Sequence, residues 1–520
     1  MNSKEFRLER EAVWSQETLL DCCCEQSVER DFVLPDYYPD IFRVLKCTLL
    51  PSVTSVSVSG GKLTIDSEAL IRVLYVSEND KRINCIEQTA ALSKTLEVKG
   101  EMNDPTVSAL PSCDYVNCRV VNRRRLDIRG AVSTAVKVSC CKEEKVISDA
   151  SGGGIQLKKQ LSTYPAKMIA FSKRITMIEE LELSPSKPSV GTVLRCGCSV
   201  TQGECRVIAG KLMTKGEADI TFVYGCVSEA GEDTVETMRF SVPFSQMIDA
   251  PGIDESFTPE LTIRVSSCTA APKGDSASQL ECEIVLSVEG TAVKLVTGEL
   301  VRDAYSTLCE CETEPSSCGC TARTVKLEGT ARCEHTLRCT DEGVSSVYDC
   351  KAECKALSAG FDPDKNSFII SGTALFCALG ADTSGEPFFA EGQASFEGEL
   401  KAPEELKDRA GEMKLSPSAE VRSCSYYITD KGSLEMTAEL NLSLSLRGEG
   451  EGQVLRDIKL YADKPKLRDR RFAVKLCRPG GEDIWEIAKR YSCSAAAIAE
   501  ENELSEETDN NKMLLIPLTD

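Results

Sequence analysis

Cysteine is the most reactive side chain that this sequence uses in quantity, and four of its cysteines form a pair of Cys-x-Cys motifs. The chain has 27 cysteines, four of which stand close together: Cys309, Cys311, Cys318 and Cys320. Four thiolates can hold Zn²⁺ in a tetrahedral site, although the usual motif separates its cysteines by two to four residues. These four are the candidate metal ligands, but we favour a cysteine-rich linker without metal or other cofactor.

The other cysteines are expected to be free thiols. Disulfide frameworks are typical of short secreted chains, whereas thiols in a long chain without an export signal are normally kept reduced. Several cysteines also lie in apolar, alternating stretches, where a thiol packs as a small hydrophobic group. Examples are Cys47, Cys85, Cys198 and Cys377.

The histidine count removes most catalytic arrangements. His335 is the single histidine of the chain, so a Ser-His-Asp relay would need it as base, and a two-histidine metal site cannot form. The residues around His335 form no motif that gives it a partner. We therefore predict no catalytic residues and a protein that is not an enzyme.

Charge argues against nucleic acid and membrane surfaces as partners. The chain has 61 basic and 82 acidic residues, and its formal net charge is −21. A field of this sign repels phosphates and anionic headgroups. The basic cluster at residues 123–125 lies between two expected strands, and we interpret it as a solvated hairpin turn.

The sequence also predicts a protein that is neither exported nor inserted into a membrane. Residues 1–11 are polar and charged, and they lack the apolar core of a signal peptide. The longest apolar run, residues 374–381, is far shorter than the roughly 20 residues that a helix needs to cross a bilayer.

The N-terminal segment, residues 1–30, differs in pattern from the rest of the chain and predicts a helix. Residues 5–26 are rich in Glu, Arg and Leu and contain few turn residues. Their apolar positions suit an amphipathic helix, which we expect to pack on its own domain or to support oligomerisation. These positions are Leu8, Ala12, Trp14, Leu19 and Leu20.

From residue 31 to residue 463 the apolar pattern has period two, which predicts antiparallel sheet. Residues 63–76 and 434–447 show the alternation most clearly. Gly60-Gly61-Lys62-Leu63 returns as Ala209-Gly210-Lys211-Leu212, 211 − 62 = 149 residues later, and a weaker third copy begins at Lys365. We therefore expect three tandem domains of the β-sandwich or barrel class, at residues 31–150, 155–305 and 306–463.

The first copy resembles a known domain. It opens with Pro39-Asp40-Ile41, followed by a strand that contains Arg43-Val44-Leu45. This opening resembles the SPOCS domain of bacterial spore-coat proteins. The second and third copies lack Pro-Asp-Ile. Copies two and three share instead a tail, Val301-Arg302-Asp303-Ala304-Tyr305 and Leu455-Arg456-Asp457-Ile458.

Residues 472–518 predict a small module with the order strand, helix, helix, strand. Gly480-Gly481 turns the chain, and Asp483 is a good N-cap for a helix with Trp485, Ile487 and Ala488 on its inner face. This order and its motif steps resemble the LysM module. We expect those three inner residues to be core rather than site.

The resemblance to LysM implies a shallow groove that binds N-acetylglucosamine chains. Carried over to this sequence, the groove residues are Gly481, Glu482, Asp483, Ile484, Asn502, Glu503, Leu504 and Ser505. The opening departs from the usual LysM pattern, and residues 472–520 carry 5 basic and 10 acidic side chains.

Tandem SPOCS-like domains followed by one LysM-like module resemble the SipL-type spore coat morphogenetic proteins. The resemblance implies a non-enzymatic assembly scaffold in the mother-cell cytoplasm, at the forespore surface and in the spore coat. Its module would dock the ATPase of the coat's basement layer, and other coat proteins and self-association are further expected contacts. The alternative is a peptidoglycan-binding protein of the spore cortex or cell wall.

Overall fold

The structure is a computed structural model, and it describes residues 6–100, 104–208, 210–228, 231, 233–274, 276–316, 324–406, 410–448, 453–466, 473–503 and 513–518. Long antiparallel strands dominate these residues, so the expected mainly β fold is confirmed. Successive side chains of a strand point to opposite faces, which is why the alternating sequence folds in this way. In β19 (Leu434–Arg447), every second residue from Leu434 to Leu446 is buried.

Domain 1, residues 7–151, is a sandwich of two three-stranded sheets. Its strands are β1 (Arg7–Val33), β2 (Ile41–Ser59), β3 (Lys62–Ser77), β4 (Ile83–Glu97), β5 (Thr106–Asn122) and β6 (Arg125–Ser151). One sheet has the order β1-β6-β5, and the other has the order β2-β3-β4. Val28, Leu49 and Leu126 come from both sheets and share one core.

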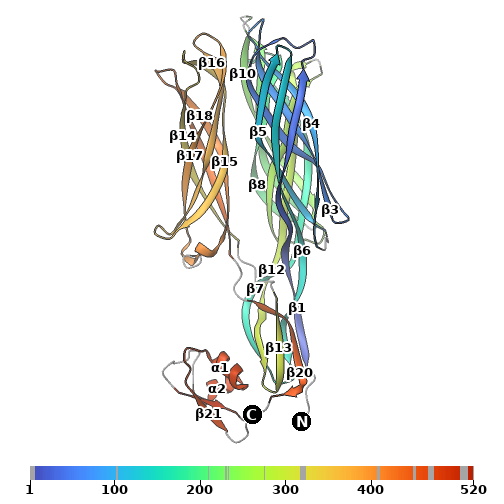
Figure 1. Ribbon diagram of the computed structural model, residues 1–520, viewed down its shortest axis with the longest axis vertical. Helices are drawn as coiled ribbons and strands as arrows, with labels where there is room; N and C mark the ends of the chain where they lie inside the picture. Colours follow the sequence, from blue (N-terminus) through green and yellow to red (C-terminus); the bar gives the residue numbers. More distant parts are fainter. Residues whose placement is uncertain are drawn as a thin grey trace.

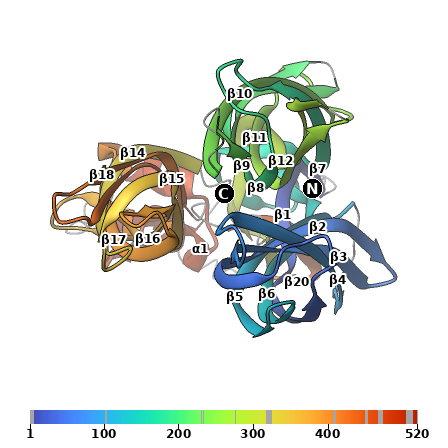
Figure 2. The ribbon, with the colours of Figure 1, turned by 90° about the horizontal axis from the view of Figure 1, so that it is seen from above.

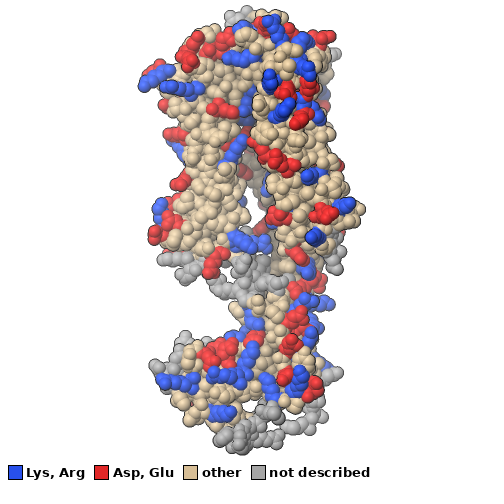
Figure 3. Space-filling model, in the orientation of Figure 1, with Lys and Arg blue, Asp and Glu red and all other residues tan. Residues whose placement is uncertain are grey.

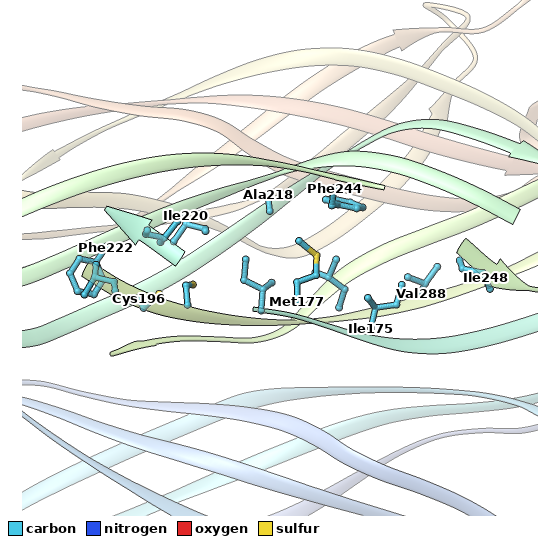
Figure 4. Packing of buried hydrophobic residues seen from close by; sticks show 14 of the residues in the cluster. Ile175, Met177, Cys196, Ala218, Ile220, Phe222, Phe244, Ile248 and Val288 are labelled. Carbon is cyan, nitrogen blue, oxygen red and sulfur yellow. The ribbon is translucent and has the colours of Figure 1, made fainter. Parts of the chain in front are cut away.

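Domain 2, residues 155–306, repeats this plan. Its strands are β7 (Ile155–Glu182), β8 (Thr192–Ile208), β9 (Lys211–Val227), β10 (Asp233–Asp249), β11 (Thr258–Lys273) and β12 (Ser276–Ser306). The sheets have the orders β10-β9-β8 and β11-β12-β7. Between them lies a buried cluster that includes Ile175, Ile220 and Phe244 (Figure 4).

Domain 3, residues 324–447, is the third sandwich. Its strands before β19 are β14 (Thr324–Leu337), β15 (Val344–Asp362), β16 (Ser367–Asp382), β17 (Pro387–Lys401) and β18 (Lys414–Ile428). Two 3-10 turns, η1 (Glu404–Leu406) and η2 (Ala410–Glu412), lie between β17 and β18. The sheets are β14-β19-β18 and β15-β16-β17.

The helix expected in residues 1–30 is wrong, because Arg7–Val33 is strand β1. β1 pairs with β6 along its whole length, from Arg7 opposite Ser151 to Val33 opposite Arg125. The paired residues lie between 125 − 33 = 92 and 151 − 7 = 144 positions downstream, so no local pattern indicates the pairing. Burial against that partner outweighs the helical preference of the Glu- and Leu-rich segment.

Three two-stranded ribbons are formed by six strand segments, and they lie below the sandwiches (Figure 1). We call them the stalk: residues 7–16 with 141–151, 155–167 with 294–306, and 309–316 with 454–465. The third ribbon consists of β13 (Cys309–Ser316) and β20 (Val454–Pro465). The segment expected as a cysteine-rich linker is therefore partly strand.

The three ribbons contribute equivalent residues to a shared core. Buried positions recur at intervals of 154 residues (300 − 146 = 454 − 300 = 154), and they are Val146, Leu300 and Val454 in one layer and Ile147, Val301 and Leu455 in the next. Seen from above, the three sandwiches likewise group around a common centre (Figure 2). The repeat found in the sequence is thus also a repeat in space, close to threefold.

The last described part is a small module at the end of the stalk (Figure 1). It contains β21 (Val474–Cys477), α1 (Ile484–Tyr491), α2 (Ala495–Glu501) and β22 (Leu514–Pro517), and β21 pairs antiparallel with β22. This is the strand-helix-helix-strand order that the sequence predicts. We call it the C-terminal module. These two helices are both too short to span a bilayer, and the described residues contain none that could.

Candidate functional site

The turn that enters α1 contains four of the predicted groove residues. Gly480 and Gly481 have φ values of +62° and +95°, which favour glycine because a side chain is strained there. Asp483 is the N-cap, and its Oδ1 accepts a hydrogen bond from the N–H of Glu486 at 2.7 Å. The expected cap is therefore present, and it is built from a residue of the predicted groove.

The other described groove residues close the opposite end of the helical pair. Asn502 donates to the carbonyls of Ile498 and Leu515 at 2.8 and 2.7 Å, and its Oδ1 accepts from the N–H of Leu515 at 2.7 Å. Its side chain therefore fastens the end of α2 to β22. Glu503 is the next residue and is exposed. The remaining two, Leu504 and Ser505, lie outside the described residues.

The inner face of α1 is core, as expected. Trp485, Ile487 and Ala488 are buried together with residues of β21, α2 and β22. Ile484 is half-buried at the border of this cluster. Of the groove residues that the structure describes, Ile484 alone belongs to this apolar cluster.

The module's core includes a residue of domain 2. Tyr305, near the end of β12, is buried in it, and its ring lies edge-on to that of Trp485 with 4.9 Å between centroids. Its hydroxyl donates to the carbonyl of Cys493 at 2.8 Å. Burial raises the pKa of Tyr305, so this hydroxyl stays a donor. The stalk therefore completes the core of the C-terminal module.

Polar contacts surround the apolar contact between Tyr305 and Trp485. Asp303 accepts a hydrogen bond from Nε1 of Trp485 at 2.8 Å and forms an ion pair with Nζ of Lys489 at 2.7 Å. Lys158 pairs with the N-cap Asp483 at 2.9 Å. These contacts fix the α1 side of the module against the second ribbon of the stalk, and they engage one predicted groove residue.

Asp303 has a counterpart in each of the other two ribbons. Asp149 pairs with Lys159 at 2.9 Å, and Asp457 pairs with Arg10 at 2.7 Å. Each of those ion pairs joins two neighbouring ribbons. The pair of Asp303 instead joins the stalk to the C-terminal module.

The reason for the exception is visible in the third ribbon. Arg10 and Lys159 occupy the same position in the first and second ribbons. The third ribbon has Pro315 there, opposite Leu455, and proline offers no cation. The carboxylate of Asp303 is consequently available for contacts with the C-terminal module. The sequence shows the Arg-Asp tail as part of the repeat, but it does not show that Asp303 in this tail contacts the C-terminal module.

One face of the module remains uncovered by the stalk. β21 and β22 expose Val474, Leu476 and Leu515, and Met513 stands just before β22. Leu476 and Leu515 lie directly opposite each other in the ladder, and Leu476 is 64% exposed. We call these four residues the apolar ribbon face. Large exposed apolar patches rimmed by polar groups are typical of sites of protein interaction.

The zinc candidates are only partly described. Cys309 is buried and Cys311 half-buried in β13, while Cys318 and Cys320 lie outside the described residues. A different set of thiols is brought together in the described part of the chain. Cys196, Cys268 and Cys282 have sulfurs within 4.8 Å of one another.

The basic cluster 123–125 lies at the hairpin turn between β5 and β6, as expected. Arg124 donates to Asp40 at 2.6 Å and to the carbonyl of Pro35 at 2.8 Å, so it clamps the loop before β2.

Elsewhere on the surface, acidic and basic side chains alternate without a field of one sign on the visible face (Figure 3). This pattern offers no continuous track for a polyanion.

Three long sandwiches around one axis, a shared stalk and a docked C-terminal module define a class of repeat-built β protein. A family model described as SipL, SPOCS domain, matches residues 40–121 and 189–273. The chain thus contains two tandem regions that match the SPOCS domain, as a SipL-type protein does. Comparison with curated proteins and with solved structures gives no match. The family is of a non-catalytic, morphogenetic type and relates the chain to sporulation and the spore coat.

Domains 1 and 2, which contain the matched regions, share a detail that domain 3 lacks. The hydroxyl of Tyr75 in β3 donates to the carbonyl of Pro39 at 3.1 Å, and that of Tyr224 in β9 donates to the carbonyl of Pro188 at 3.1 Å. β16, the corresponding strand of domain 3, contains no tyrosine. The Pro-Asp-Ile opening thus belongs to a loop that two of the three copies hold in the same way.

Proposed function

We propose that the protein is a scaffold of spore coat assembly that docks the ATPase of the coat's basement layer through its C-terminal module. The observation that carries this proposal is the mounting of the module. Its α1 side is fixed to the stalk by Tyr305 and Asp303, while the apolar ribbon face points away. A rigidly held module with an apolar face suits a protein partner, because burial of Leu476 and its neighbours drives association.

The geometry favours a protein partner over a glycan. Among the predicted groove residues, Asp483 is paired with Lys158 and Asn502 is occupied with the backbone of α2 and β22. A sugar would have to compete for these polar groups. The apolar ribbon face requires no such exchange, and its four aliphatic side chains offer a sugar few hydrogen bonds.

Binding to the purified coat ATPase tests the proposal, with the full chain and single variants. We expect Leu476→Glu to abolish binding, because a charge then has to be buried at the contact. Tyr427→Glu is the matched control: Tyr427 is 63% exposed on β18 in domain 3, remote from the module, and its substitution leaves binding unchanged.

Sedimentation with purified peptidoglycan, run in parallel, distinguishes the alternative. The scaffold proposal predicts capture of the ATPase and no co-sedimentation with glycan. Ile484→Arg changes the predicted groove but not the apolar ribbon face, so it distinguishes binding at the groove from binding at that face. If the chain sediments with glycan, loses this with Ile484→Arg and captures no ATPase with its ribbon face intact, the wall-binding function replaces the scaffold.

A further inference from the structure

Domain 2 brings two cysteines together at the seam between its two sheets. The sulfur of Cys196 in β8 lies 3.2 Å from that of Cys268 in β11. β8 and β11 are edge strands of different sheets, so this contact crosses the sandwich. Figure 4 shows Cys196 at one end of the buried cluster, near Phe222.

The other two domains carry a cysteine pair in the same two strands. In domain 1 Cys47 in β2 and Cys118 in β5 pack in the same apolar core, and each changes the pKa of the other. In domain 3 the thiol of Cys350 in β15 donates to the backbone carbonyl of Cys424 in β18 at 3.8 Å. The members of the three pairs are 71, 72 and 74 positions apart in the sequence. Three equivalent pairs in one chain indicate a shared role.

We propose that Cys47–Cys118, Cys196–Cys268 and Cys350–Cys424 are sites of reversible disulfide formation that tie together the two sheets of each SPOCS-like sandwich. A disulfide is about 2.0 Å long, so the sulfurs of domain 2 have to approach by roughly 1 Å, which small side-chain rotations can supply. The joined strands belong to separate hydrogen-bonded sheets, so each bond adds a covalent connection where only side chains meet.

The oxidant that the proposal requires is a low-molecular-weight disulfide. The thiolate of one cysteine attacks a sulfur of this disulfide, whose S–S bond breaks and releases one thiolate. The partner cysteine then loses its proton and attacks the mixed disulfide, which forms the protein S–S bond and releases the second thiolate. The pair gives up two electrons and two protons, and the small disulfide becomes two thiols.

Each pair has a sulfur that such a reagent can reach. Cys118, Cys268, Cys350 and Cys424 are half-buried, while Cys47 and Cys196 are buried. Interaction with the partner cysteine lowers the pKa of Cys118 and that of Cys350. A lowered pKa increases the thiolate fraction and therefore the rate of attack. Cys118 and Cys350 are thus suited to react first, and Cys47 and Cys424 to close the bond.

A metal site explains the pairs less well. The third thiol of the domain 2 group, Cys282, has Ile128 and Met436 at the positions 154 residues before and after it. Domains 1 and 3 therefore repeat the pair and not the triad. The sulfur of Cys282 is also farther from Cys268, at 3.9 Å, than that of Cys196. What recurs in all three domains is the two-thiol arrangement.

Peptide mapping of the full chain tests the proposal. The reduced protein is treated with oxidised glutathione, blocked with an alkylating agent in denaturant and digested without reductant. We expect three cross-linked peptides, one for each of the proposed pairs. Closing loops of this length lowers the unfolding equilibrium constant of a domain on the order of a thousandfold, so the oxidised chain unfolds at higher temperature.

Single variants assign each bond. Cys118→Ala, Cys268→Ala and Cys424→Ala should each remove one linked peptide and leave the other two. Cys85→Ala is the control, since Cys85 is buried beside no other thiol that affects its pKa, and it should leave all three. The proposal is overturned if the wild-type chain forms none of the three links or mainly other pairings. It also fails if the reduced chain retains one zinc ion that Cys268→Ala loses and no Cys196–Cys268 link forms.

Discussion

At the scale of single residues, Asp303 shows how a repeated position acquires a new partner. Its counterparts Asp149 and Asp457 hold neighbouring ribbons together. Asp303 instead accepts from Trp485 and Lys489 of the C-terminal module. A carboxylate that accepts hydrogen bonds from an indole N–H and from an ammonium group fixes both the position and the orientation of α1.

We predict that Asp303→Ala loosens the module from the stalk while the sandwiches stay folded. Loss of two charge-assisted hydrogen bonds at a half-buried site should weaken docking by about 1–2 kcal/mol. Fluorescence reports it: in a Trp14→Phe background, Trp485 is the single tryptophan, and its emission should shift to the red. Asp457→Ala is the matched control, because it removes the equivalent carboxylate of the third ribbon. Equal shifts in both variants would contradict a specific role for Asp303.

A second prediction concerns the pH dependence of docking. Burial raises the pKa of Asp483, but the hydrogen bonds from Lys158 and from the N–H of Glu486 outweigh it and hold this pKa below the ordinary value of 3.8. A carboxyl with a lowered folded-state pKa contributes stability above its ordinary pKa and loses it as the pH falls through the folded value.

Docking should therefore weaken below about pH 4 by a few tenths of a kcal/mol, since both partners are half-exposed. Acid titration of Trp485 emission measures this effect. Asp483→Asn keeps an N-cap oxygen but has no charge to lose, so its titration should lack the component assigned to Asp483. Identical titrations of the two chains would rule out a contribution from the ion pair.

At the scale of elements, the long strands serve two cores. The upper half of β12 packs in the sandwich of domain 2, whereas its lower half contributes Leu300 and Val301 to the stalk. β-bulges fall between the two halves, at Ala166 in β7, opposite Lys294 and Leu295 of β12, and at Leu19 in β1. A bulge bends and twists a strand, which lets one strand leave its sandwich and turn toward the common axis.

Truncation of one stalk residue tests this shared core. Leu455→Ala removes a buried side chain at the axis and should cost about 2–5 kcal/mol, with unfolding of the stalk at lower urea concentration. Leu161→Ala is the control, since Leu161 lies in the same stalk and is 69% exposed, and it should change stability by less than about 0.5 kcal/mol. A similar cost for both would mean that the ribbons do not share a core.

The sequence predicted what local patterns encode and missed what depends on distant partners. Alternation in residues 434–447 sufficed for β19, and the turn glycines and Asp483 sufficed for the start of α1. The strand that pairs with β1 begins only at position 125, so a helix was expected in residues 1–30. The pairing of Cys47 with Cys118 and the docking of Asp303 require the domains to be superposed, which becomes possible once the repeat is seen in space.

At the scale of the whole molecule, the three sandwiches also meet above the stalk. Leu45, Leu194 and Tyr348 come one from each domain and belong to a single apolar cluster. Because all three domains contact one another in this cluster, they form one assembled unit rather than a series of separately linked domains. A scaffold of this kind can hold the C-terminal module at a fixed distance and direction from its sandwich faces (Figure 1).

An ion pair between domains 2 and 3 provides the test at this scale. Arg195 donates from Nε and Nη2 to the two carboxylate oxygens of Asp349, both at 2.7 Å, and Asp349 is 12% exposed. Asp349→Ala leaves the guanidinium without this partner, so the contact between the domains should weaken by about 1–3 kcal/mol. Hydrogen exchange of β15 should then rise, and the radius of gyration should increase. Glu328→Ala, in an exposed pair within β14, should change neither. Unchanged exchange in Asp349→Ala would mean that the domains are held together by the apolar cluster alone.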